Sequence, residues 1–181
     1  MSVSRRDSIL DAALPVFLAH GVAGASIGEI QAASGASVGS IYHWFGTKEG
    51  IAAALYCRAL AGYQAGVVAT LRAHEDAEAG VRQVVAGYLR WVEGHPDDAR
   101  FLLEVRVAPG DELRALNRSF FAEVVGWAEP RLRVARIELV YALWLGPGQE
   151  LARMWLAGST PDPPGAHAEI LADAAWSALR P

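Results

Sequence analysis

Residues 26–48 read SIGEIQAASGASVGSIYHWFGTK, and this stretch predicts two short helices joined by a tight turn. Ser26 and Glu29 form a Ser-x-x-Glu capping box, which marks the start of the first helix. Gly35 stands where a left-handed backbone would end that helix, and Ser37 caps the next one. A short helix, a tight turn and a second, presented helix are the parts of a helix-turn-helix, whose second helix fits the major groove of DNA.

Similar signals on both sides of this stretch predict an all-α fold. Ser4 caps a first helix that Gly21 ends. Thr47 caps a long helix in which apolar residues recur at four-residue steps: Ile51, Leu55, Ala59, Tyr63 and Val67. Strand-like alternation is nearly absent, so the sequence argues against sheet-based enzymes. Further helices are predicted at residues 77–93, 96–107, 111–128, 138–156 and 167–179, with Pro147 expected to kink or split the fourth of these.

Composition and charge limit the classes of function. The 181 residues are 52% hydrophobic and 20% charged, which suits one ordinary domain or a small module attached to a larger one. The net charge is −4, so the broad cationic surface of a nonspecific polyanion binder is absent. Residues 1–50 contain three cations and four acids, so any binding of nucleic acid must depend on where individual groups lie.

The helix after Ser37 has two kinds of face. Ile41 and Phe45 are four residues apart and can pack together into the small module. The other faces can meet a partner, and they carry Val38, Gly39, Ser40, Tyr42, His43 and Trp44. Backbone N–H groups at the start of this helix can bind phosphate without a cation, and Lys48 at the next helix start supplies one more contact.

These residues resemble the tetracycline-repressor (TetR) type of transcriptional regulator. The resemblance covers roughly the first 50 residues and is carried by the segments 9–13, 26–30 and 34–49 together with Phe17 and Gly21. It implies a homodimer whose paired recognition helices enter successive major grooves of a palindromic operator. It also implies a helical domain that binds a small molecule and releases the DNA, so we expect a DNA-binding domain at residues 1–46 and a ligand-binding and dimerisation domain at 47–181.

The family pattern also implies roles for individual residues. Contacts mainly to phosphates are implied for Ser26, Ser37, Tyr42, His43 and Lys48. Positions nearest the base edges are implied for Val38, Gly39, Ser40 and Trp44. Val38 stands where a polar or basic residue is frequent in the family, and Trp44 where His is frequent, so the operator sequence does not transfer by analogy.

Enzymatic and metal-binding alternatives have weaker support. Gly-x-Ser-x-Gly occurs twice, around Ser26 and Ser37, but a nucleophile elbow needs a strand entering it, and helix capping explains both serines. His74 and Glu78 are four apart without a third ligand, so no metal site is predicted. The single cysteine, Cys57, is interpreted as a packed side chain. We therefore expect no catalytic residues and no cofactor.

The N-terminus superficially resembles a secretory or twin-arginine leader. Asp7 and Asp11 interrupt the would-be apolar region, and no run of about 18 apolar residues occurs, so the sequence predicts neither a leader nor a membrane span. The protein is expected to be cytoplasmic.

Aromatic residues of the second half have two interpretations. In the first, which is the more frequent role of such rings, they only fill the core; in the second, they line a cavity for an apolar or aromatic ligand. The candidate lining residues are Trp91, Phe101, Phe120, Trp127 and Trp144. Glu104 or Arg106 could orient such a ligand if either pointed inward.

The last two helices carry a candidate dimer interface. The stretch 143–158 looks like the C-terminal segment of one regulator subgroup, and the final helix has an apolar stripe. The candidate residues are Leu151, Trp155, Ile170, Leu171, Ala174 and Ala178. The alternative is that the stripe packs inside its own subunit. A broader alternative is an all-α small-molecule-binding or protein-interaction module without DNA affinity.

Overall fold

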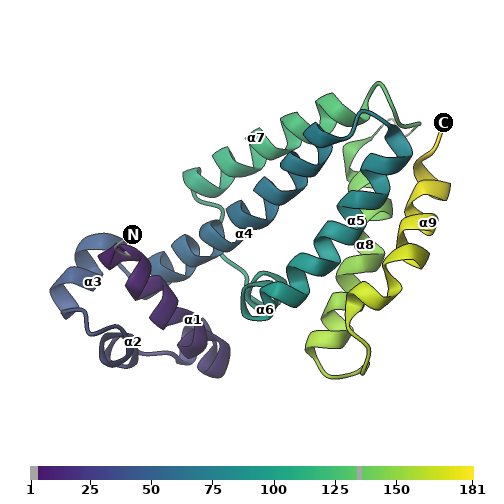
Figure 1. Cartoon of the computed structure of the whole chain (residues 1–181). Helices are drawn as coiled ribbons and strands as arrows, with labels where there is room; N and C mark the ends of the chain where they lie inside the picture. The colour runs from purple at the N-terminus through teal and green to yellow at the C-terminus, as the bar shows by residue number, and fades with distance from the viewer. Residues whose placement is uncertain (1–3, 134–135) are drawn as a thin grey trace. The chain divides into compact units, whose positions relative to one another are not determined.

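The computed structural model describes residues 4–133 and 136–181, which form α-helices and one short 3-10 helix and contain no strand (Figure 1). The prediction of an all-α fold is therefore confirmed. The elements are α1 Arg5–Gly24, α2 Ile27–Ser34, α3 Val38–Phe45, α4 Lys48–Ala73, α5 Ala77–Gly94, α6 Pro96–Glu104, α7 Asp111–Ala128, α8 Ile137–Leu156, η1 Pro164–His167 and α9 Ala168–Leu179.

Four predicted helix starts are confirmed by hydrogen bonds of the capping side chain. The Oγ atoms of Ser4, Ser26 and Ser37 accept from the backbone N–H three residues on, at 3.1, 3.2 and 3.1 Å. Thr47 Oγ1 accepts from Gly50 N in the same way at 3.0 Å. Each cap of this kind contributes about 1 kcal/mol to helix stability.

Some predicted boundaries differ from the structure. At Gly21 the backbone leaves the helical conformation, with φ 67° and ψ 164°, but one more turn follows before α1 ends. Pro147 lies inside α8, which runs unbroken through it, so of the two predicted effects the split is wrong and the kink stays a prediction. The helix predicted at 96–107 ends at Glu104, because Val105 and Val107 pack against a hydrophobic core instead.

The chain forms two compact units. The first contains residues up to Leu60 together with Asp97–Leu113, and the second contains Ala61–Pro96 and Arg114–Pro181. Because the first unit draws in α6 and the start of α4, it differs in extent from the domain predicted at residues 1–46. The functional boundary between residues 46 and 47 stays a prediction.

The first unit is built around one hydrophobic core. Its fully buried side chains come from every helix of the unit: Ile9, Leu10, Phe17, Ile30, Ile41, Ile51, Leu55 and Phe101. The Phe17 and Phe101 rings stack with centroids 6.1 Å apart. Burial of this core holds α2 and α3 at a fixed angle of presentation.

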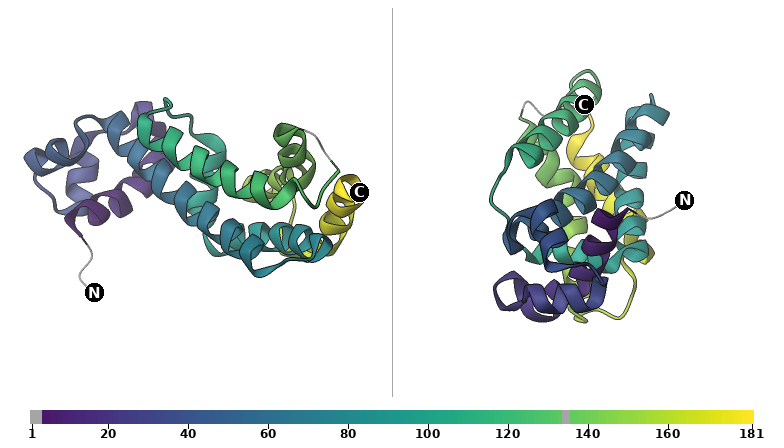
Figure 2. Two further views of the ribbon diagram at one scale, coloured as in Figure 1. Left: turned by 90° about the horizontal axis from the view of Figure 1, so that it is seen from above. Right: turned by 90° about the vertical axis from the view of Figure 1, so that its left-hand side faces the viewer.

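The second unit is a helical bundle. Helix α5 packs against α8, α9 and η1, and α8 packs against α9, as the views in Figures 1 and 2 agree. The later half of α4 is joined to α7 by hydrogen bonds from Gln64 to Asn117, at 3.0 Å, and from Arg72 to Glu123. One helix of the described residues, α4, is long and apolar enough to cross a membrane by length and composition alone, and half of the relevant window is buried, as in a core helix.

Candidate nucleic-acid interface

Helix α3 presents an exposed face with large apolar and aromatic side chains. Ile41 is 1% exposed and holds the helix to the core of the first unit. Elsewhere on the helix Val38, Tyr42 and Trp44 are 40%, 49% and 49% exposed. Large apolar and aromatic side chains are more often buried, so three of them exposed on one short helix favour a contact with another molecule.

The remaining predicted residues of α3 lie at the same surface. Gly39 and His43 are exposed and Ser40 is half-buried. The His43 and Trp44 rings meet edge to face with centroids 5.6 Å apart. Ser37 Oγ accepts from Ser40 N, whereas the first N–H groups of α3 have no acceptor within the helix. Those donors suit a phosphate oxygen.

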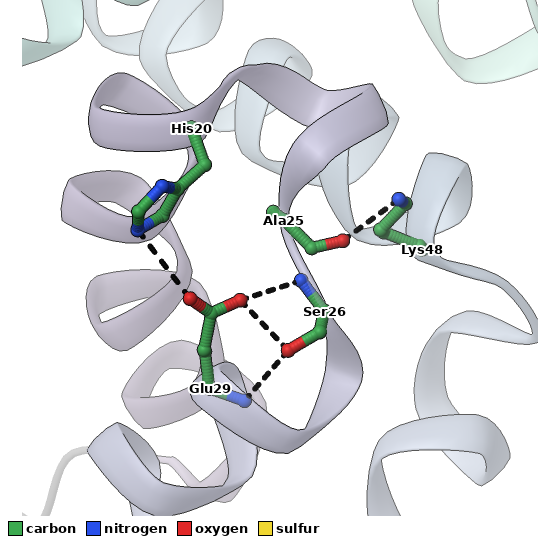
Figure 3. A network of polar contacts seen from close by, with 5 residues as sticks. All are labelled: His20, Ala25, Ser26, Glu29 and Lys48. Atoms are coloured by element: carbon green, nitrogen blue, oxygen red, sulfur yellow. Dashed lines mark hydrogen bonds and ion pairs between the residues drawn. The ribbon is translucent and has the colours of Figure 1, made fainter.

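Lys48 has contacts that the sequence did not reveal. Its Nζ donates to the carbonyl oxygens of Ala23 and Ala25, each at 2.8 Å, and so ties the start of α4 to the connection between α1 and α2; Figure 3 draws the second of these bonds. An ammonium group has three N–H donors, so one remains for a phosphate. No local pattern signals these bonds, because they join residues more than twenty positions apart.

Ser26 is fully engaged by its capping box (Figure 3). Glu29 Oε2 accepts from Ser26 N at 2.8 Å and from Ser26 Oγ at 2.7 Å, and Glu29 Oε1 lies 3.4 Å from His20 Nε2. The Ser26 hydrogen bonds, and less strongly His20, lower the pKa of the Glu29 carboxyl. A phosphate oxygen would have to replace Glu29 as the acceptor to bind Ser26.

Three of the predicted phosphate-contacting residues surround one surface hollow. Ser26, Tyr42 and Lys48 line it together with Ala25, Ile27, Thr47 and Glu49, and its volume is about 410 Å³. The structure thus brings the end of α3, the start of α2 and the start of α4 to one place. Their contact with DNA stays a prediction.

The candidate enzyme and metal residues have structural roles. Ser26 and Ser37 of the two Gly-x-Ser-x-Gly segments are both helix caps, and no strand precedes either one. Within residues 4–133 and 136–181, no three His, Cys, Asp or Glu side chains group as a metal site would require. Cys57 is buried, and desolvation raises the pKa of its thiol.

The five aromatic candidates for lining a cavity have different surroundings, each within its own unit. Phe101 is 0% exposed in the core of the first unit, because α6 packs there, so its assignment to a cavity is corrected. In the second unit, Trp127 and Trp144 pack on each other with ring centroids 5.7 Å apart. Their indole Nε1 atoms donate to the His74 and Val81 carbonyls at 2.8 and 2.9 Å. These two rings fill the core, although one edge of Trp127 also lines a surface hollow.

Trp91 and Phe120 line two separate pockets of the second unit. Phe120 lies in one of about 230 Å³ beside Gln64. Trp91 lies in one of about 300 Å³ between α4 and α5, together with Tyr63, Tyr88 and Arg90. Glu104 and Arg106 are exposed and belong to neither pocket.

Two polar atoms near these pockets lack partners. Tyr63 Oη and Gln64 Oε1 are buried and make no hydrogen bond among the described residues. Burial raises the pKa of Tyr63 well above its usual range, and Tyr141 and Tyr88 nearby reinforce that shift. Burial likewise raises the pKa of Tyr88. The sequence gives one hint of this buried hydroxyl, because Tyr63 stands among the apolar residues that recur at four-residue steps along the long helix.

The predicted dimer residues lie partly on an open apolar face of α8 and α9. Ile170 is 70% exposed, Ala174 and Ala178 are exposed, and Leu171, Leu151 and Trp155 are half-buried. Leu139, Leu143 and Met154 of α8 add exposed fractions of 52%, 41% and 43%. The stripe that packs inside the subunit is a different one, formed by Ala172, Ala175 and Leu179. Contact with a second copy stays a prediction.

Comparison with known proteins adds independent findings. Residues 9–55 match the family model described as bacterial regulatory proteins, tetR family. The sequence matches none of the curated proteins with which it was compared. The fold is similar to that of a TetR family transcription regulator from Marinobacter aquaeolei VT8, with a TM-score of 0.82 and 20% identity over 97% of this chain and 95% of that one.

Two further solved structures extend the similarity. A putative tetR family regulator from Shewanella sp. PV-4 has a TM-score of 0.74 and 17% identity, covering 99% of this chain and all of that one. The transcriptional regulator FadR from Bacillus subtilis, solved in complex with stearoyl-CoA, has a TM-score of 0.75 and 16% identity over 93% and 96% of the two chains. Residues 9–55, which include the helix-turn-helix, thus match the N-terminal region of the tetR family of bacterial regulatory proteins, and the chain shares its fold along nearly its whole length with solved TetR family transcription regulators.

Proposed function

We propose that this protein is a ligand-responsive repressor that binds a palindromic operator as a homodimer. The proposal depends on the exposure of α3, where Val38, Tyr42 and Trp44 reach the surface while Ile41 anchors the helix to the core of the first unit. A helix so presented fits the major groove, and two copies related by a two-fold axis read two half-sites.

The proposed contacts divide into two groups. Val38, Gly39, Ser40 and Trp44 lie nearest the base edges, where the Val38 side chain suits a thymine methyl group. Ser37, Tyr42, His43 and Lys48 contact phosphates, and Ser26 joins them only by exchanging Glu29 for a phosphate oxygen. The local balance of charge is slightly negative, so affinity depends on these placed donors rather than on a basic surface.

The apolar face of α8 and α9 supports the homodimer. Its exposed side chains, above all Ile170, form a patch that a second copy would cover in an isologous interface. Two observations support release of the DNA by a ligand. The similar protein FadR was solved with stearoyl-CoA, and the second unit of this chain has pockets. A ligand acts by favouring a spacing of the two α3 helices that no longer matches the DNA.

Fluorescence-anisotropy titration of labelled duplexes tests DNA binding. With a duplex selected from a random pool, Ser40→Asn should change which sequences bind best, because Ser40 faces the bases. Gln83→Glu, on an exposed position of α5, is the control and should leave the preference unchanged. Equal affinity of the wild type for all duplexes at low salt would contradict the proposal.

A second candidate function is an all-α ligand-binding or interaction module without DNA affinity. The observation that favours it is the net charge of −4, with no excess of cations in the first 50 residues. The same titration separates the two, since this module would leave every duplex unbound.

A further inference from the structure

The pocket between α4 and α5 combines features that specify a chemical class of ligand. Its volume is about 300 Å³, at the small end of the range for small-molecule sites, so it suits a compound of one or two rings. All of its lining residues belong to the second unit. A long acyl-CoA does not fit a pocket of this size.

Aromatic rings form one wall of the pocket. Tyr63 contacts Tyr88 edge to face with centroids 5.5 Å apart and lies 5.4 Å from Trp91. Val67 and Val84 add aliphatic surface. Flat aromatic ligands stack well on walls of this kind.

One of the lining residues carries a buried hydroxyl without a partner. Tyr63 is 6% exposed, and its Oη makes no hydrogen bond to any described residue. An unpaired buried hydroxyl is unfavourable, and it gains most from a ligand that donates to it or accepts from it. The ligand therefore carries a hydroxyl or similar group on its ring.

One ionised side chain lines the pocket, and it is a cation. Arg90 is exposed and has no ion-pair partner within residues 4–133 and 136–181, and the other lining residues are uncharged. A guanidinium binds a carboxylate through two parallel hydrogen bonds. The exposed Arg90 thus matches an anionic group of the ligand, and the buried Tyr63 hydroxyl matches a neutral polar group.

We propose that this pocket binds a hydroxylated aromatic carboxylate, with its ring against Tyr63, Tyr88 and Trp91, its hydroxyl at Tyr63 Oη and its carboxylate at Arg90. The proposal rests on the effector-binding role proposed above and names the ligand class. Its test uses the purified protein without DNA, so that its outcome is separate from operator binding.

The probes are 4-hydroxybenzoate, 4-hydroxyphenylacetate and 4-hydroxycinnamate, each compared with the same acid lacking the hydroxyl. Binding is measured by isothermal titration calorimetry and by quenching of tryptophan fluorescence, because Trp91 lies in the wall. The best of the three should bind with a Kd of about 10–100 µM, as expected for a ligand of this size.

Two variants identify the contacts. Tyr63→Phe should weaken binding of the best hydroxy acid about tenfold and leave its hydroxyl-free counterpart unaffected. Arg90→Gln should weaken both acids about tenfold and leave 4-methylphenol, which has no carboxylate, unaffected. Arg118→Gln, a matched change at an exposed arginine of α7, should alter none of these affinities. Tyr63→Phe should not lower the thermal midpoint of the free protein, since its hydroxyl has no partner to lose.

The proposal is overturned if none of the hydroxy acids binds below about 1 mM, or if binding is indifferent to both variants. Operator binding that persists in that case leaves the regulator function standing and removes only this ligand class. If the protein binds the acids but binds no duplex, the ligand class stands and the DNA-binding function is removed.

Discussion

Lys48, the single lysine of the chain, shows how one residue can serve two purposes. Two of its N–H donors hold the Ala23 and Ala25 carbonyls, and the third is free for a phosphate at the hollow it shares with Tyr42. The sequence could place a cation at this helix start. It could not reveal the two carbonyls, because their approach depends on how α1, α2 and α4 pack together.

Replacing Lys48 with alanine should have two measurable effects. Operator affinity should fall for all sequences, and the slope of log K against log salt should become shallower by about 0.9, the loss of one phosphate contact. The thermal midpoint should also fall, because two carbonyls lose their donor. Arg118→Ala is the control, and a Lys48→Ala slope equal to that of the wild type would remove Lys48 from the interface.

Among the elements, those with local start signals could be predicted and those set by packing could not. Four helix starts could be predicted because a capping side chain bonds to a backbone N–H only three residues further on. These caps are Ser4, Ser26, Ser37 and Thr47. The end of α6 is set instead by burial of Val105 and Val107, and the place of Phe101 by its stacking on Phe17, both distant in sequence. The pocket at Tyr63 likewise requires two helices to be in place.

The capping box of α2 makes the stability of the first unit depend on pH. The pKa of Glu29 is lowered from its ordinary value of 4.5, so its contribution is fully present above that value and is lost as the pH falls through the lower, folded-state pKa. Glu29→Gln should therefore lower the thermal midpoint at pH 7. The difference between the two proteins should shrink below about pH 4.5, and a difference constant across this range would show that the carboxylate charge is not involved.

The contact of α5 with α7 depends on a glycine. A Cβ atom added at Gly80 would lie 2.2 Å from Trp127 Cζ2, so the indole would have to leave its place and its hydrogen bond to His74. Gly80→Ala should lower the free energy of unfolding by about 1–3 kcal/mol. Gly126→Ala, where a Cβ meets nothing within 4 Å, should leave it unchanged or raise it. Urea denaturation measures both, and equal effects would contradict this packing.

For the whole molecule, assembly depends on the face of α8 and α9. Ile170→Glu places a charge at its most exposed apolar position, so the protein should become monomeric at micromolar concentration in analytical ultracentrifugation. Its operator affinity should fall because two half-sites are then bound independently. Gln83→Glu, the same change of charge on α5, should stay dimeric. A dimeric Ile170→Glu protein would place the interface elsewhere.

We propose that α3, presented twice by a symmetric pair of chains, reads a specific DNA sequence. Selection of bound duplexes from a random oligonucleotide pool at low ionic strength tests it most directly. We expect enrichment of one motif made of two inverted half-sites, with centres about one helical turn apart or a multiple of it. Recovery of a pool with no enriched motif would contradict it.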